Sequence, residues 1–316
     1  MNKIFITGAT GFVGSHLIEY LLGLEKYEIY GTSFGSDEGF VKDLIGDNLR
    51  QLNLLDEGEI KSLVLDLKPE FVVHLAALSS PHKSTENPTK TITNNISAQI
   101  NLLEAIKLLE DPPTTLIIGS AEEYGLVDGK HIPIDESTPL NPANPYAVSK
   151  VSQDYLGLQY YNSNNLPIIR IRPFNHTGER RSPTFVLPAF AKQIAEIEVG
   201  KKGGLEVKGD LTVTRDFTDV KDMVIAYELA LHKCQPGEIY NIGSGKGVVI
   251  QDLLDLIISK SNTNISVKKE DAKPSKVRQL ICNPGKFHQA TGWEAKIPLQ
   301  DTVQRVLNYW REQIKE

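Results

Sequence analysis

Three polar residues, Ser120, Tyr146 and Lys150, have the types and spacing needed for proton and hydride chemistry. Tyr146 and Lys150 are four residues apart in Tyr-Ala-Val-Ser-Lys, so a helix places them on one face. A phenol, with an ordinary pKa of about 10, is a poor acid–base group at neutral pH, and a neighbouring ammonium lowers that pKa. Ser120 follows a strand-forming run, at the sheet edge where parallel sheets bind ligands. In a hydride-transfer site, Ser120 would polarise a carbonyl, Tyr146 would donate a proton to it, and Lys150 would lower the pKa of Tyr146. The Tyr/Lys pair alone also fits an ordinary surface helix.

A glycine-rich loop near the N-terminus would hold the hydride carrier. Gly8, Gly11 and Gly14 follow a strand-forming run and open a helical stretch. The first glycine permits a sharp turn, the second lets the backbone approach a pyrophosphate, and the third allows close packing of helix on strand. This arrangement predicts dinucleotide binding. The next predicted strand ends at Thr32 and Ser33, without the acid that would bond the adenosine ribose of NAD, so NADP(H) is favoured over NAD(H).

Short strands that alternate with helical stretches would position these groups. Strands are expected at 3–7, 28–31, 49–54, 71–74, 115–119 and 167–172, and helices near 14–24, 56–67, 94–110 and 146–161. The alternation predicts an α/β fold with a Rossmann-type doubly wound parallel sheet. After residue 175, helical stretches near 184–199, 220–232 and 250–260, interleaved with short strands such as 238–242, predict a smaller C-terminal α/β lobe that binds the substrate. The expected domains are 1–175 and 176–316, with a part around 215–245 returning to the first domain.

The composition excludes several other classes of protein. Of 316 residues, 40% are hydrophobic and 23% charged, which excludes a disordered chain. The net charge of −6 argues against nucleic-acid and acidic-membrane partners, and the apolar runs are too short to span a membrane. Cys234 and Cys282 are too few for a disulfide framework or a zinc site, and no metal is expected. Because the N-terminal residues lack a signal-peptide pattern, we expect a cytoplasmic protein.

Longer motifs resemble the extended short-chain dehydrogenase/reductase family of nucleotide-sugar enzymes. These motifs are T-G-A-T-G-F-V-G at 7–14, H-L-A-A at 74–77, N-P-Y-A-V-S-K at 144–150 and R-P-F-N-H at 172–176. Within that family the chain most resembles the GDP-6-deoxy-4-keto-mannose reductases, through G-S-A-E-E-Y-G at 119–125, R-D-F-T-D-V at 215–220 and T-G-W-E-A-K-I-P-L at 291–299. The resemblance covers essentially the whole chain.

The resemblance implies roles for individual residues. The implied catalytic residues are Ser120, Glu122, Tyr146 and Lys150. Besides Tyr146 and Lys150, the implied cofactor-binding residues are Gly8, Thr10, Gly11, Phe12, Val13, Gly14, Thr32, Ser33, Asn53, Leu54, Leu75, Ala76, Ala77, Asn95 and Phe174. The implied substrate-binding residues are Ser79, Ser80, Glu122, Asn175, Val186, Lys192, Arg215 and Lys273, the last of which stands where similar reductases carry an arginine.

The implied reaction is the NAD(P)H-dependent reduction of the C4 ketone of an NDP-4-keto-6-deoxyhexose. A GDP-linked sugar is favoured, so that GDP-4-keto-6-deoxy-D-mannose would become GDP-D-rhamnose. Related 4,6-dehydratases carry a threonine before the glutamate that removes the C5 proton, whereas this chain has Ser120 and Ala121 before Glu122. We therefore expect Glu122 to hydrogen-bond the sugar. A GDP-mannose 4,6-dehydratase or a sugar 4-epimerase with a retained cofactor is the alternative, and a non-catalytic NAD(P)-binding regulator is a further one.

Three smaller expectations concern the rest of the chain. The helices at 95–110 and 146–161 imply a homodimer through a four-helix bundle, although their apolar residues also fit packing within one chain. His74 is expected to be a packed strand histidine, while His176 fits either a substrate contact or packing. Arg180 and Arg181 fit either a phosphate contact or a solvated loop pair, and the loop pair is favoured.

Overall fold

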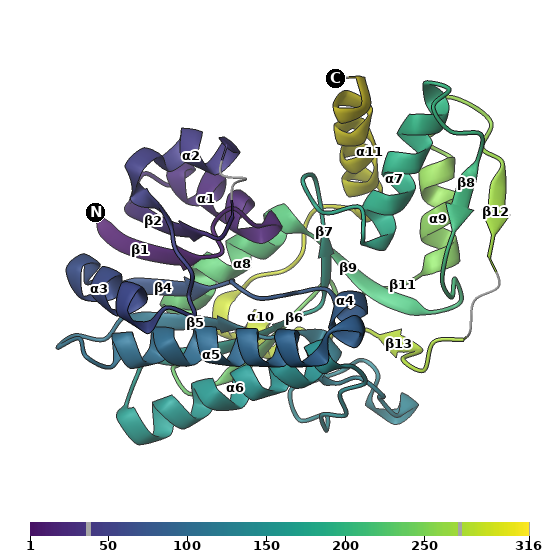
Figure 1. Ribbon diagram of the computed structural model, residues 1–316. Coiled ribbons are helices and arrows are strands. Elements are labelled where there is room, and N and C mark those ends of the chain that lie inside the picture. The colour runs from purple at the N-terminus through teal and green to yellow at the C-terminus, as the bar shows by residue number, and fades with distance from the viewer. Residues whose placement is uncertain (36–38, 271–273, 316) are drawn as a thin grey trace.

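In the residues that the computed structural model describes, 1–35, 39–270 and 274–315, seven parallel strands form a central sheet (Figure 1). Their order is β10-β6-β5-β4-β1-β2-β3. The chain therefore adds β2 and β3 on one side of β1 and then β4, β5 and β6 on the other side, so that the strand order switches between β1 and β4. The strands are β1 (Asn2–Thr7), β2 (Tyr27–Ser33), β3 (Leu49–Gln51), β4 (Phe71–His74), β5 (Thr114–Ile118), β6 (Ile168–Pro173) and β10 (Ile239–Ile242). The predicted Rossmann-type fold is confirmed. The sheet holds one strand more than the six expected from the first half of the chain, because β10 from the second half joins it.

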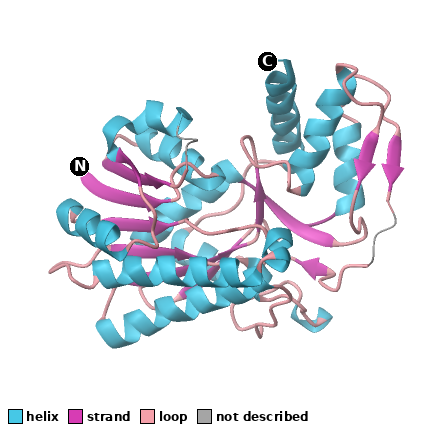
Figure 2. Cartoon of the chain, in the orientation of Figure 1, coloured by secondary structure: helices cyan, strands magenta, loops and turns pink. Residues whose placement is uncertain are grey.

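Helices cover both faces of this sheet (Figures 1 and 2). On one face lie α3 (Glu57–Leu67), α5 (Pro88–Ile106) and α6 (Pro145–Asn164), which share one apolar cluster with the strands. On the other face lie α1 (Phe12–Gly23) and α8 (Val220–Lys233), with α2 (Gly39–Ile45) and α10 (Gly285–Thr291) beside them. Thus α8 and β10, which come from the second half of the chain, are part of the central sheet and of the helical layers that cover it. The domain boundary at residue 175 stays a prediction.

The start of α6 is fixed by local sequence. Asn144 is its N-cap, and the Asn144 side-chain oxygen accepts a 2.8 Å hydrogen bond from the Ala147 N–H. Pro145 follows in the first turn, where its missing N–H would have no partner within the helix. The Tyr146 N–H donates to Ser84 Oγ at 3.1 Å, on the short helix α4 (Pro81–Glu86). Tyr146 and Lys150 therefore occupy the first two turns of α6.

The remaining C-terminal elements build a second apolar cluster. It joins α7 (Val186–Glu198), α9 (Ile250–Ile258) and α11 (Leu299–Lys315), the last of which the sequence pattern did not predict. The short strands are β7 (Asn175–Thr177), β8 (Leu205–Val207), β9 (Thr214–Asp219), β11 (Gly247–Val249), β12 (Val267–Lys269) and β13 (Gln279–Leu280). Because β7 directly follows β6, the chain enters this lobe from the carboxyl end of a sheet strand. Among the described helices, none has the length and apolar character to cross a membrane.

Candidate active site

A cavity of about 800 Å³ lies at the carboxyl edge of the parallel strands, in the size range of small-molecule sites. Its walls come from the loops that follow β1, β2, β3, β4, β5 and β6, from helices α5, α6 and α8, and from residues 180–182, 184 and 185 of the second lobe. The predicted site residues that line it are Gly8, Thr10, Gly11, Phe12, Val13, Gly14, Thr32, Ser33, Asn53, Leu54, Leu75, Ala76, Ala77, Ser79, Ser80, Ser120, Glu122, Tyr146, Lys150, Phe174 and Asn175. The fold thus collects residues from six loops around one space.

The glycine-rich loop has the backbone geometry of a phosphate cradle. Gly8 adopts a φ of +70°, and a Cβ there would lie 2.9 Å from the Ala76 nitrogen. A Cβ at Gly14 would lie 2.6 Å from the Ala9 carbonyl oxygen, so the start of α1 packs directly on the loop. The first turn of α1 carries no acidic residue, and its N-terminal end faces the cavity. The uncompensated positive end of the helix dipole suits the pyrophosphate of a dinucleotide.

Tyr146 and Lys150 are both buried against the end of β5. The Lys150 ammonium donates a 2.7 Å hydrogen bond to the Ile118 carbonyl, and burial lowers the pKa of Lys150 to about 8. Burial raises the pKa of Tyr146 well above its ordinary value, although a hydrogen bond with Ser120 and the charge of Arg181 act to lower it. In this structure the Lys150 ammonium faces the Ile118 carbonyl, and burial outweighs the effect of nearby cations on the phenol, so the lowering of the phenol pKa by Lys150 stays a prediction. Tyr146 is a protonated phenol at neutral pH.

Ser120 and Glu122 follow β5 in a tight 3₁₀ turn, Ala121–Glu123. Ser120 is the N-cap of that turn, and its Oγ accepts a 3.1 Å hydrogen bond from the Glu122 N–H. The Glu122 carboxylate lines the cavity and accepts a 3.1 Å hydrogen bond from the Asn144 side-chain amide. Its negative charge raises the pKa of Tyr146. A hydroxyl, a carboxylate and a phenol thus meet where β5 and α6 adjoin.

Arg180 and Arg181 line the cavity, so the prediction of a solvated pair is wrong. The Arg181 guanidinium carbon lies 3.9 Å from the ring centroid of Phe185 and 4.9 Å from that of Phe12. Arg180 Nε donates a 3.1 Å hydrogen bond to Ser15 Oγ on α1. The two cations lie beside the glycine-rich loop, where phosphates would be expected. Their position soon after R-P-F-N-H was the available signal, but it does not specify which way the loop folds.

Two buried histidines and one tyrosine complete the surroundings. Burial lowers the pKa of His74 and of His176 to about 3, so both rings are neutral at neutral pH. His74 pairs with Thr7 Oγ1 at 2.8 Å, as expected for a packed strand histidine, whereas His176 lines the cavity. The sequence reasoning missed Tyr227 of α8, a fully buried cavity residue whose hydroxyl has no partner among the described residues.

Other predicted site residues lie apart from this cavity. Asn95 is fully buried, and its side chain bonds the Leu78 backbone and Ser149, so it supports the cavity wall from behind. The Arg215 guanidinium donates to the carbonyls of Thr214 and Val277. Val186 begins α7, and the Lys192 ammonium lies 5.6 Å from the Trp310 ring centroid. Lys273 lies outside the described residues, and the roles of Val186, Lys192 and Arg215 stay predictions.

The residues present fit a nicotinamide dinucleotide. The glycine cradle would hold its pyrophosphate, Thr32 and Ser33 would lie near the adenosine ribose, and the unpartnered Tyr227 hydroxyl leaves a buried donor for a polar group. Among the described residues, no cluster of three or more His, Cys, Asp or Glu side chains is arranged to hold a metal ion.

Comparisons with known proteins identify the family of the chain. Residues 5–306 match the sequence family described as GDP-mannose 4,6-dehydratase. The chain is 29% identical to the GDP-6-deoxy-D-mannose reductase of Pseudomonas aeruginosa over 318 residues, covering 100% of this chain and 99% of the relative. It is 28% identical to the GDP-mannose 4,6-dehydratase of Vibrio cholerae, covering 95% and 91%.

Solved structures give the same family resemblance in three dimensions. The structure of RMD from Pseudomonas aeruginosa in complex with NADPH superimposes with a TM-score of 0.88 at 30% identity, over 99% of this chain and 100% of that one. The UDP-glucose 4-epimerase of Thermus thermophilus in complex with NAD gives 0.86 at 26% identity, over 98% and 99%. The chain therefore belongs to the GDP-mannose 4,6-dehydratase family, among the extended short-chain dehydrogenase/reductase enzymes that use a nicotinamide cofactor on nucleotide sugars.

Proposed function

We propose that this enzyme reduces the C4 ketone of an NDP-4-keto-6-deoxyhexose, with GDP-4-keto-6-deoxy-D-mannose as substrate and GDP-D-rhamnose as product. The observation that carries the proposal is the meeting of Ser120, protonated Tyr146 and Lys150 at the end of β5, inside the cavity that the glycine-rich loop enters. The similarity to a GDP-6-deoxy-D-mannose reductase over the full chain supports the same reaction.

Each catalytic residue has one task in this reaction. The bound cofactor would supply a hydride to the C4 carbon. Ser120 would hold the C4 oxygen: its Oγ accepts the Glu122 N–H, and its hydroxyl, which hydrogen-bonds Tyr146 in this structure, would donate to that oxygen when substrate is bound. Tyr146 donates its phenolic proton to the same oxygen as negative charge develops there. Lys150 stabilises the phenolate that remains, and its ammonium holds a ribose hydroxyl of the cofactor.

The protonation state of Tyr146 is the one that a reductase needs. A reductase needs a protonated donor, which the raised pKa of Tyr146 provides. Dehydratases and epimerases begin with oxidation at C4, which needs a base at this position. Glu122 is held by the Asn144 amide through one carboxylate oxygen. Its other oxygen remains to accept a hydrogen bond from a sugar hydroxyl, as we propose.

The substrate would extend from this point toward the second lobe. Ser79, Ser80 and Asn175 line the cavity and are proposed to bond the hexose. Arg215 and Lys192 are proposed to neutralise the nucleotide phosphates, an arginine being suited to them through its paired donors. Arg215 would have to exchange its backbone carbonyl partners, those of Thr214, Val277 and Arg278, for phosphate oxygens on binding.

The direct test is a substrate panel of GDP-, dTDP- and UDP-4-keto-6-deoxyhexoses, followed by NADPH absorbance and product analysis. The proposal predicts one NADPH consumed per keto sugar, with the GDP-linked substrate preferred. Turnover of GDP-mannose without net NADPH consumption would instead identify a 4,6-dehydratase, which the presence of Glu122 keeps as the second candidate.

We further propose a homodimer in which α5 and α6 pair with their copies. The two helices lie side by side, and α6 exposes Val148 and Tyr155 on one face. Sedimentation of the wild type and of Tyr155→Glu tests this: the proposal predicts a dimer that the variant weakens, and a monomeric wild type would contradict it.

A further inference from the structure

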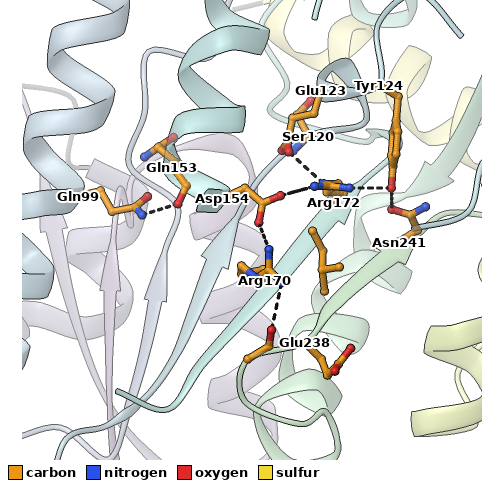
Figure 3. A network of polar contacts seen from close by, with 12 residues as sticks. Gln99, Ser120, Glu123, Tyr124, Gln153, Asp154, Arg170, Arg172, Glu238 and Asn241 are labelled. Atoms are coloured by element: carbon orange, nitrogen blue, oxygen red, sulfur yellow. Dashed lines mark hydrogen bonds and ion pairs between the residues drawn. The ribbon is translucent and has the colours of Figure 1, made fainter. Parts of the chain in front are cut away.

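The turn that carries Ser120 and Glu122 also carries a second glutamate, Glu123, which the proposed reaction does not use. Glu122 lines the cavity. Glu123 is completely buried, and its carboxylate lies next to Arg172 in the core (Figure 3). A buried carboxylate costs free energy unless it is paired and hydrogen-bonded. The contacts of Glu123 therefore indicate what its burial achieves.

One oxygen of the Glu123 carboxylate holds the catalytic serine. Glu123 Oε1 accepts a 2.7 Å hydrogen bond from the Ser120 N–H, while Ser120 Oγ accepts the Glu122 N–H at 3.1 Å. The two bonds form a capping box that fixes Ser120 through both its backbone and its side chain. The Ser120 oxygen accepts the Glu122 N–H through one lone pair, and the Ser120 side chain also hydrogen-bonds Tyr146, so the hydroxyl lies beside the proposed proton donor.

The other oxygen anchors the turn to the core. Glu123 Oε2 accepts a 2.9 Å hydrogen bond from Arg172 Nε on β6. Arg172 also bonds Asp154 of α6 and Tyr124, whose hydroxyl donates to Asn241 of β10 at 2.7 Å (Figure 3). Ser120 is thereby tied through Glu123 to two strands and to the helix that carries Tyr146 and Lys150.

The neighbouring Gly119 makes this contact possible. A Cβ at Gly119 would overlap Glu123 Oε1 and would lie 3.1 Å from the Ile171 carbonyl oxygen. Any side chain at position 119 would push the carboxylate away from the Ser120 N–H. The contact between Glu123 and the Ser120 N–H therefore requires glycine at position 119.

The charge of Glu123 also acts on the catalytic lysine. Burial and the nearby Asp154 raise the pKa of Glu123, while Arg172 and the Ser120 N–H lower it. Burial lowers the pKa of Lys150, and the Glu123 charge acts in the opposite direction. The other ionisable groups packed around these two residues are Arg170 from β6, Glu122 and Tyr124 from the turn, Tyr146 from α6 and His74 from β4.

We propose that Glu123 is a positioning residue that acts through Ser120, holding its hydroxyl in the direction of the reacting C4 oxygen. This inference rests on the proposed function, in which Ser120 bonds that oxygen. A purely structural carboxylate would stabilise the fold equally well whether position 120 were serine or alanine. A positioning carboxylate loses its effect on catalysis when the serine hydroxyl is absent.

A double-mutant cycle separates these two roles. Glu123→Gln, Ser120→Ala and the double variant are compared with the wild type for kcat, for KM and for the Kd of NADPH. We expect Glu123→Gln to lower kcat about tenfold in the wild-type background and less than about twofold in the Ser120→Ala background, with the Kd of NADPH unchanged. Equal losses of kcat in the two backgrounds would overturn the proposal.

Asp154→Asn is the matched control, because Asp154 is buried in the same network and bonds Arg170 and Arg172 without touching Ser120. Its loss of thermal stability should resemble that of Glu123→Gln, and its effect on kcat should be the same in both backgrounds. Coupling of Asp154 to Ser120 as strong as that of Glu123 would contradict a specific role. If Glu123→Gln does not fold, Gly119→Ala replaces it in the double-mutant cycle, because the added Cβ displaces the Glu123 carboxylate without removing the carboxyl group.

The cycle is measured on whichever family reaction the wild type catalyses, because Ser120 would bond the C4 oxygen in reduction, dehydration and epimerisation alike. Absence of NADPH consumption with the keto sugar then refutes only the proposed function. Additive losses in the cycle refute only the role of Glu123.

Discussion

Replacement of Lys150 by methionine is predicted to make the protein more stable while it abolishes turnover. Lys150 is buried, and its pKa falls from 10.5 to about 8 because burial disfavours the ammonium. That change corresponds to a destabilisation of the folded state of about 3 kcal/mol at pH 7. Lys150→Met removes this penalty and leaves the Ile118 carbonyl without its 2.7 Å donor, which costs about 1 kcal/mol. The net gain is about 2 kcal/mol, or a Tm higher by about 4 °C.

The pH dependence of this difference provides a sharper test. Between pH 8 and 10.5 the unfolded chain binds a proton at Lys150 that the folded chain has lost, so raising the pH stabilises the wild type. The variant should therefore be more stable than the wild type by a constant amount below about pH 8, and this gain should shrink as the pH rises toward 10.5. Above that pH only the lost hydrogen bond to Ile118 remains, so the variant should be about 1 kcal/mol less stable than the wild type.

Urea unfolding of both proteins across this pH range measures the difference directly, and NADPH turnover should fall at least about 100-fold in the variant. A Lys150→Met protein that is less stable than the wild type by an amount independent of pH would refute the reasoning.

Three other predictions concern the same cavity. Tyr146→Phe removes the proton donor and should lower kcat about 1000-fold while the Kd of NADPH, measured by fluorescence, changes less than about threefold. Gly14→Ala places a Cβ 2.6 Å from the Ala9 oxygen and should weaken NADPH binding by at least about tenfold in calorimetry, whereas Gly23→Ala, whose Cβ would meet nothing within 4 Å, should not. NADPH should be preferred to NADH by about tenfold in kcat/KM, because Thr32 and Ser33 present no carboxylate to repel a 2′-phosphate.

Specific results would contradict each of these. Substantial turnover by Tyr146→Phe would exclude the phenol as proton donor. Equal NADPH affinities for Gly14→Ala and Gly23→Ala would show that cofactor binding does not need the close packing of α1 on the glycine-rich loop. A preference for NADH would overturn the interpretation of the end of β2.

Most of the helices and strands could be predicted from the local pattern of apolar and glycine residues, because their formation depends on neighbouring residues in the chain. The strand from Phe71 to His74 was predicted with the bounds that the structure has, because a short apolar run between helical stretches has few other structures open to it. The glycine-rich loop was predictable because Gly8 and Gly14 are required by backbone contacts within one βα unit. β10 was expected as a strand, but its pairing with β6 depends on a long return of the chain that no local pattern specifies.

Charge and burial at the site were harder to predict than residue identity. Helical spacing correctly placed Tyr146 and Lys150 in one cavity, but it could not show that the ammonium bonds the Ile118 carbonyl. Two adjacent glutamates look alike in the sequence, and only the tight turn directs Glu122 into the cavity and Glu123 into the core. Arg181 was misinterpreted for the same reason, since its contact with Phe12 depends on how the two lobes meet.

The measurement that tests the central claim most directly is the stoichiometry of NADPH and GDP-4-keto-6-deoxy-D-mannose in one reaction with purified enzyme. The account predicts one NADPH oxidised for each keto sugar consumed and GDP-D-rhamnose as the product. Consumption of GDP-mannose with the cofactor unchanged at the end of the reaction would contradict it.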